Sequence, residues 1–134
     1  MNDDLDVLMQ VIGIVSEQMP GVTVGDALPP LDDLDAMLPC VTIDVLPGEQ
    51  RAVAWGGEDF PVRLDGVPLD VEVFAPSRAQ AMQVAKRLRL VLHQLPHIAG
   101  TDVTDVDCPA FGSREDLNPN VRAVGVICDL TLHS

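Results

Sequence analysis

The sequence predicts an α+β fold with a mainly antiparallel sheet and two helices packed on one of its faces. Two segments carry apolar residues at helical spacing, while several others alternate apolar and polar residues and are separated by Gly, Pro and Asp. The predicted order, α-β-β-β-β-α-β-β, keeps most strands next to other strands, which is typical of an antiparallel sheet covered by helices. With 134 residues, 47% of them apolar, we expect a single domain over residues 1–134.

The first helix is predicted to begin at Asn2 or Asp3 and to end near Met19, before Pro20 and Gly21. Apolar residues at three- and four-residue spacing form its core-facing stripe: Leu5, Leu8, Ile12, Val15 and Met19. A second apolar flank consists of Val7, Val11 and Ile14. We therefore expect this helix to be covered on more than one side, by the rest of a larger fold or by a neighbouring subunit.

Four strands are predicted next, near residues 22–24, 40–46, 60–64 and 67–74. Residues 25–39 are too rich in Pro and Asp to predict regular structure, so we interpret them as a surface connection. The fourth strand alternates most cleanly, with four apolar residues on one face and Asp70 and Glu72 on the other. This alternation predicts a half-buried antiparallel strand.

Residues 47–59 predict a mobile hairpin arm because their glycines permit tight turns. Trp55 lies in this arm, beside two glycines and two acidic residues. It packs either on its own core or against a partner. We favour the partner contact because a glycine-rich arm has little core of its own.

The second helix is predicted to begin near Pro76 and Ser77 and to end before Pro96. One face is apolar and is expected to pack on the sheet: Ala81, Val84, Ala85, Leu88, Val91, Leu92 and Leu95. An adjoining face is basic: Arg78, Lys86, Arg89 and His93. This basic face is either a solvated surface or a docking surface for an acidic patch on another copy, and the sequence favours neither.

Two more strands complete the predicted sheet. Residues 101–108 alternate imperfectly, since Val103 and Val106 fall on opposite faces unless a bulge intervenes. A polar loop leads into the last strand, whose core-facing residues are Val124, Val126, Cys128, Leu130 and Leu132. The other face of the sheet is then expected to be polar and acidic, with Thr42, Asp44, Asp70, Glu72, Asp129 and Thr131.

The charge balance excludes an ordinary nucleic-acid-binding domain. The chain has 21 acidic and 8 basic side chains and a formal charge of −13, whereas affinity for phosphates comes from clustered Lys and Arg. The acidity is concentrated in residues 1–67, which contain 13 acidic and 2 basic side chains. The N-terminal sequence has no basic region followed by an apolar run, so we expect a soluble intracellular product without a membrane segment.

No motif predicts chemistry, so we expect no catalytic residues, no cofactor, no metal and no enzyme activity. His93 and His97 have the spacing of two metal ligands on a helix, but Pro96 lies between them. The acidic run from residue 32 to 35 lacks the glycine and the terminal glutamate of a calcium loop. Cys40, Cys108 and Cys128 lie in strand segments without CxxC spacing, which indicates small buried hydrophobes in a reducing compartment.

The whole pattern resembles a family of structural proteins. The segments that carry the resemblance are LPCVTIDVLPG, DGVPLDVEVFAPSRAQAMQVAKRLRLVLHQLP and NVRAVGVICDLTLHS. With the amphipathic first helix, this organisation resembles the tail terminator, or tail completion, proteins of long-tailed bacteriophages. The resemblance implies a hexameric ring on the last ring of the tail tube that stops polymerisation of the tube protein and forms the head-docking surface.

The resemblance also implies partners and a location. The partners are further copies of the chain, the major tail tube protein and a head–tail connector protein, in a virion tail or neck assembled in the host cytoplasm. DNA passes the ring without specific binding, and no membrane is involved. The family has no catalytic residues to transfer to this sequence.

Two surfaces follow from the ring hypothesis. An acidic channel face contains Asp44, Asp70, Glu72 and Asp129, and a subunit interface contains Arg78, Lys86, Arg89 and Trp55 with Asp32, Asp33 and Asp35 as the acidic patch. Two alternatives remain open. One is a head-closure or neck connector protein of the same virion, and the other is a small ligand-binding or catalytic α+β domain with its site under residues 102–107.

Overall fold

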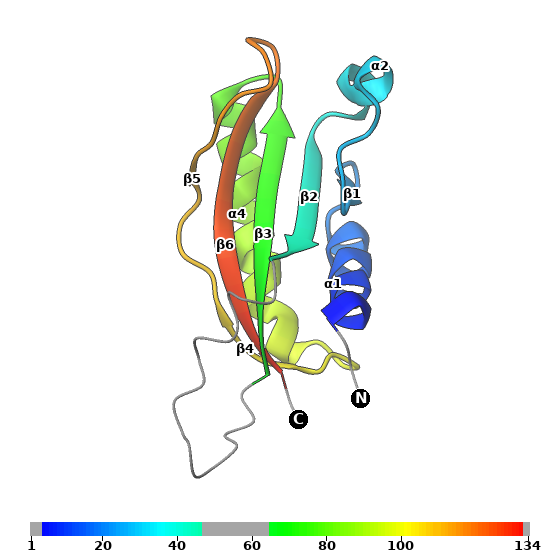
Figure 1. Cartoon of the computed structure of the whole chain (residues 1–134), viewed down its shortest axis with the longest axis vertical. Helices are drawn as coiled ribbons and strands as arrows, with labels where there is room; N and C mark the ends of the chain where they lie inside the picture. Colours follow the sequence, from blue (N-terminus) through cyan, green and yellow to red (C-terminus); the bar gives the residue numbers. More distant parts are fainter. Residues whose placement is uncertain (1–3, 47–64, 133–134) are drawn as a thin grey trace.

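Two eleven-residue strands, β3 (Asp65–Ala75) and β6 (Arg122–Leu132), form the centre of the sheet. A computed structural model describes residues 4–46 and 65–132 (Figure 1). The two strands pair antiparallel over their whole length, from Asp65 opposite Leu132 to Ala75 opposite Arg122. Their predicted core-facing residues are all buried, which confirms both alternations: Val67, Leu69, Val71 and Val73 on β3, and Val124, Val126, Cys128, Leu130 and Leu132 on β6.

The remaining strands extend this pair on both sides in the order β1-β2-β3-β6-β4. On one side, β2 (Cys40–Val45) pairs antiparallel with β3, and β1 (Thr23–Gly25) pairs parallel with β2. On the other side, β4 (Val103–Asp107) and β5 (Gly112–Ser113) pair antiparallel with successive parts of β6. The mainly antiparallel α+β class is therefore confirmed, although the order of elements differs from the prediction.

A bulge in β4 resolves the imperfect alternation of its sequence. The pairing register with β6 shifts between Val103 and Asp105, so Thr104 is the extra residue. Val103 is buried and Val106 packs against the same core. The conditional prediction of a bulge at this place is confirmed.

The two long helices, α1 (Asp4–Gln18) and α4 (Arg78–Gln94), pack on the same face of the sheet, as predicted. In Figure 1, α4 lies behind β3 and β6, and α1 lies beside β2. The backbone N–H of Gln80 donates to the Ser77 hydroxyl at 3.2 Å, so Ser77 caps α4 and Pro76 lies outside it. The predicted apolar face of α4 is buried except for Val91, which is half-buried.

The apolar stripe of α1 is only partly as predicted. Val7 and Val11, expected on a second flank, belong to the main core and are 2% and 0% exposed. Leu5, expected in the core stripe, is 62% exposed, and Ile12 is half-buried. The buried side of α1 is therefore rotated toward Val7 and Val11. Apolar spacing alone does not determine which of two neighbouring apolar sides of a helix faces the sheet.

The connection after β1 contains regular structure, so the prediction of an irregular segment over residues 25–39 is wrong in part. A short helix, α2 (Leu31–Leu34), continues into a 3₁₀ turn, η1 (Asp35–Met37). Pro30 has a φ of −53° at the N-cap position, and acidic residues in the first turn favour a helix N-terminus. The third helix and the 3₁₀ turn change the predicted element order.

Helix α2 closes a second, smaller core on the opposite face of the sheet. Leu34 is buried there with side chains from β2, β3, β6 and the residue before β6: Cys40, Phe74, Ala123 and Val121. Phe74 shares its face with Asp70 and Glu72 because the three alternate along β3. One end of the predicted polar face is therefore apolar and covered.

The other differences concern connections. A second 3₁₀ turn, η2 (Leu95–His97), follows α4, and β5 lies within the segment predicted as a polar loop. The predicted arm over residues 47–59, Trp55 within it and the predicted strand near residues 60–64 lie outside the described residues.

Candidate functional site

The four carboxylates predicted on one face of the sheet lie on that face in the structure. We call them the acidic sheet face: Asp44, Asp70, Glu72 and Asp129. Asp44 pairs directly with Asp70 across β2 and β3, Thr42 pairs with Glu72, and Pro68 pairs with Asp129 across β3 and β6. Directly opposite residues project to the same side of a sheet, so the register places the four carboxylates together.

Arg114 lies over this face, which the sequence analysis did not anticipate. Its Nη2 atom donates to Asp70 Oδ1 at 3.0 Å, and its Nη1 atom donates to Glu72 Oε2 at 3.3 Å. The Arg114 backbone N–H donates to the carbonyl of Ala123, so the residue is fixed beside β6 while its side chain reaches β3. Arg114 therefore neutralises part of the charge of Asp70 and Glu72.

Gly125 provides the space through which the Arg114 side chain crosses β6. A Cβ atom at position 125 would lie 2.7 Å from Arg114 Cζ and 2.9 Å from its Cγ. Atoms this close repel, so a residue with a side chain at position 125 would displace Arg114. A glycine inside an otherwise apolar strand can mark such a close approach, and this was the available sequence signal.

Burial and neighbouring charges raise the pKa values of two acids of this face, Glu72 and Asp129. Burial is the main cause that raises the pKa of Glu72, Asp70 raises it further, and Arg114 opposes both. Burial also raises the pKa of Asp129, with a further contribution from Asp107, its partner across β4 and β6. The Asp107–Asp129 pair thus places two like charges opposite each other, whereas the Asp70–Glu72 pair has a cationic partner.

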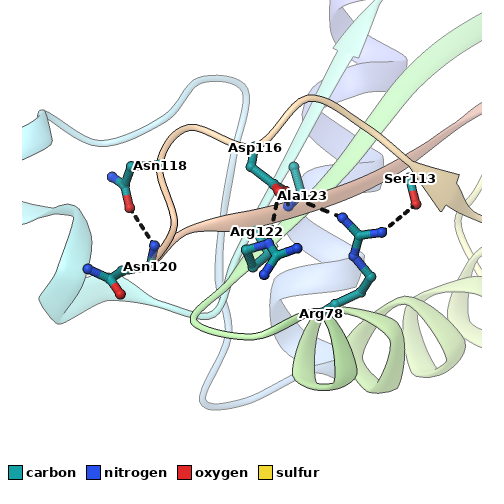
Figure 2. A network of polar contacts seen from close by, with 7 residues as sticks. All are labelled: Arg78, Ser113, Asp116, Asn118, Asn120, Arg122 and Ala123. Carbon is teal, nitrogen blue, oxygen red and sulfur yellow. Dashed lines mark hydrogen bonds and ion pairs between the residues drawn. The ribbon is translucent and has the colours of Figure 1, made fainter.

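A second charged cluster fixes the segment after β5, residues 114–121, against β6 and α4 (Figure 2). Asp116 Oδ1 accepts from the Ala123 backbone N–H, and Asp116 Oδ2 accepts from Arg122 Nε, both at 2.8 Å. The hydrogen bond from Ala123 is the main cause that lowers the pKa of Asp116, and Arg122 and Arg78 add to it. Asp116 is therefore held in its ionised form.

The predicted basic face of α4 is partly used inside the chain. Arg78 lies 3.7 Å from Asp116 Oδ2 and donates to the Ser113 hydroxyl at 3.0 Å, as Figure 2 shows. Arg89 Nε donates to the Cys108 carbonyl at 2.8 Å, and His93 Nε2 lies 3.3 Å from the same oxygen. Lys86 is exposed, and no described acidic side chain pairs with it. Among the described residues, Lys86 is thus the member of this face whose charge has no partner.

Lys86 lies between two exposed apolar side chains. Met82 and Leu90 precede and follow it by one helical turn and are 40% and 67% exposed. Arg87 is also exposed but lies about 100° further around the helix. We call Met82, Lys86 and Leu90 the α4 stripe.

The acidic residues predicted to meet the basic face have a similar setting. Asp32 and Asp33 lie in α2 and Asp35 lies in η1, and all three are exposed. Leu31 before them is 76% exposed, and Met37 after them is 38% exposed. We call residues 31–37 the α2 patch. No ion pair joins its aspartates to another described residue. Helix α2 packs on the opposite face of the sheet from α4, so the α2 patch and the α4 stripe of one chain lie apart.

Ligand-binding features are few in the described part of the chain. A groove of about 370 Å³ is lined by Gln18, Leu90, Val91, Gln94 and Ile98, none of which is charged. Among residues 4–46 and 65–132, no group of three or more His, Cys, Asp and Glu side chains is placed to hold a metal ion. No described helix is both long enough and apolar enough to cross a membrane.

Comparison with known proteins adds no assignment: neither the models of known protein families nor the curated protein sequences contain a match to this chain.

Proposed function

We propose that the chain is a structural protein of a bacteriophage tail that forms a hexameric ring, ends polymerisation of the tail tube and provides the surface on which the head docks. The observation that carries the proposal is the placement of opposite charge on the two layers of the fold. The acidic sheet face lies on one side, and the α4 stripe lies on the helix layer, which packs on the other face of the sheet. Such a subunit has complementary surfaces for its own copies.

In the proposed ring, the acidic sheet face lines the channel. Arg114 offsets only part of the charge of Asp70 and Glu72, and Asp44 and Asp129 have no ion-pair partner among the described residues. A wall of carboxylates repels phosphates, so DNA passes along it without being held. The arrangement suits transport of DNA and not its retention.

The α4 stripe of one subunit meets the α2 patch of the next in this proposal. Each surface combines charge with exposed apolar side chains: Lys86 between Met82 and Leu90, and the aspartates between Leu31 and Met37. Apolar contacts exclude water while the charges set register and partner choice. Arg78 and Arg89 support the contact by holding α4 against its neighbours, and Trp55 remains a proposed partner contact.

The function is tested by assembling tail tubes with and without the chain. Purified tube protein is polymerised alone or with the wild-type chain, and tube lengths are measured in negative-stain images. We expect overlong tubes without the chain and a bounded length distribution with it. Identical length distributions would contradict the proposal. Binding to the head–tail connector protein without any effect on tube length would instead indicate a head-closure or neck connector protein.

A further inference from the structure

Cys108, directly after β4, and Cys128, on β6, are neighbours inside the main core. Asp107, the last residue of β4, pairs with Asp129 on β6, so Cys108 directly follows one member of this pair and Cys128 directly precedes the other. Both side chains belong to the main core and are 3% and 0% exposed. The two thiols therefore point to the same side of the sheet.

The backbone spacing at this position suits a covalent link. Opposite residues of antiparallel strands have Cα atoms about 4.5–5.5 Å apart. A disulfide spans Cα separations of about 4.4–6.8 Å. The Asp107–Asp129 pair next to the two cysteines has this spacing, so a bond between Cys108 and Cys128 needs little movement of the backbone.

The surroundings of the two thiols differ, so their reactivities differ. A hydrogen bond from the Cys128 thiol is the main cause that lowers the pKa of Cys108, and the Arg89 guanidinium also lowers it, against burial and Asp107. The same hydrogen bond and burial raise the pKa of Cys128. Cys108 thus ionises first, and the Cys128 sulfur lies next to it and can react once the Cys108 sulfur is oxidised.

Cys40 provides an internal comparison. It is buried in the second core, opposite Phe74, and burial raises its pKa. The strand order separates it from the other two cysteines, because β3 lies between β2 and β6. Cys40 therefore has no partner thiol among the described residues.

We propose that Cys108 and Cys128 form a redox-active dithiol that a peroxide converts into a disulfide joining β4 to β6. The Cys108 thiolate attacks one peroxide oxygen, the O–O bond breaks, and a sulfenic acid and a hydroxide form. The Cys128 sulfur then attacks the Cys108 sulfur, the S–O bond breaks, and the second hydroxide leaves. The two hydroxides take up the two thiol protons as water, so two thiols are oxidised and one hydrogen peroxide is reduced.

The test uses the purified full-length chain and hydrogen peroxide. The folded, reduced chain is treated with peroxide, unfolded in urea, alkylated with iodoacetamide and digested for mass spectrometry. We expect two of the three cysteines to lose alkylation, the chain to lose the mass of two hydrogen atoms, and one cross-linked peptide pair to contain Cys108 and Cys128. Dithiothreitol should restore all three alkylation sites.

Three variants make the test specific. Cys40→Ser should keep the cross-link, whereas Cys128→Ser should lose it and let Cys108 proceed to sulfinic acid. Cys108→Ser should lose the cross-link as well, and the wild-type measurement does not depend on the folding of any variant. A cross-link that includes Cys40, sulfinic acid at Cys108 of the wild-type chain, or full alkylation of all three cysteines after treatment would overturn the proposal.

Discussion

At the scale of single residues, the acidic sheet face depends on a position without a side chain. Gly125 leaves room on β6 for Arg114, and Arg114 links the carboxylates of Asp70 and Glu72 on β3. Without Arg114, these two carboxylates would lie half-buried with no described cation to offset them. The balance of charge on the face is therefore set by a loop residue and a glycine.

Replacing Arg114 tests this balance. We expect Arg114→Ala to lower the free energy of unfolding by about 1 kcal/mol, a modest value because the ion pairs are partly exposed to solvent. Gly125→Ala should cost a similar amount in the wild-type chain and almost nothing in the Arg114→Ala chain, since no side chain then needs to move. Urea unfolding of the four proteins measures the coupling.

Gly112 provides the matched control for this cycle. It pairs directly with Gly125, yet a Cβ atom at position 112 would have no neighbour within 4 Å. Gly112→Ala should therefore change stability by less than about 0.5 kcal/mol. Equal costs for Gly125→Ala with and without Arg114 would show that the close approach is unimportant.

Removing one charge from the like-charged pair Asp107 and Asp129 should raise the stability of the chain, whereas removing Arg114 should lower it. Asp107→Asn or Asp129→Asn should each stabilise the chain by up to about 0.5 kcal/mol near pH 7, and the double variant should gain little more because one repulsion is removed once.

The pH dependence of this gain follows from the raised pKa of Asp129. Its ionised form is disfavoured in the folded chain, so the cost is present above the folded-state pKa and disappears as the pH falls through it. Urea unfolding at pH 7 and near pH 3 should show the gain of Asp129→Asn only at the higher pH. A gain of equal size at both values would show that the gain does not come from the ionised form of Asp129.

At the scale of elements, sequence patterns predicted what burial determines and missed what single contacts determine. The apolar face of α4 and the alternation of β3 and β6 were predictable because periodic burial requires periodic apolar residues. Helix α2 was not predictable, because Leu34 is its one buried residue and no sequence pattern predicts the second core in which Leu34 lies. Arg114 and Asp116 were also missed, because long-range ion pairs leave no periodic signal.

The segment of residues 114–121 should loosen when Asp116 is removed. In Asp116→Ala, the Ala123 N–H and Arg122 lose their acceptor, so we expect faster hydrogen exchange at Ala123 and at Arg114, which donates to the Ala123 carbonyl. Glu115→Ala is the matched control, because this exposed neighbour forms no hydrogen bond or ion pair with β6. Unchanged exchange in Asp116→Ala would argue against a fixing role.

The same contact should respond to acid. The pKa of Asp116 is lowered in the folded chain, so its stabilising contribution is present above the unfolded-state pKa of about 4 and is lost as the pH falls through the folded-state value. In the wild-type chain, protection of the Ala123 amide, corrected for the intrinsic exchange rate, should decline in that range. The Asp116→Ala chain should show no such decline.

At the scale of the whole molecule, the charge of −13 is divided between surfaces with different surroundings. The acidic sheet face is partly neutralised, whereas the α2 patch is exposed and unpaired among the described residues. A contact between two subunits leaves no periodic pattern in the sequence. The sequence alone therefore led only to the proposal that a basic face meets an acidic one.

A charge reversal tests the proposed contact between subunits. We expect Lys86→Glu to weaken association of the chain, because the α4 stripe would then repel the α2 patch, and a further Asp33→Lys change should restore part of it. Sedimentation velocity, alone and with tail tubes, measures both effects. Arg87→Glu is the matched control, with the same change of charge on a different side of α4. Equal effects of Lys86→Glu and Arg87→Glu would contradict a contact through the stripe.

The edges of the sheet also limit how copies of the chain can associate. In the described part of the chain, β1 has three residues, β5 has two, and β4 has five with a bulge, while the eleven-residue strands β3 and β6 are central. Short or bulged edges offer few free backbone groups in a row, so they resist unwanted strand addition and fibril growth. In the proposed ring, where copies of the chain gather at high local concentration, such edges would protect against aggregation and leave the specific contacts to side chains.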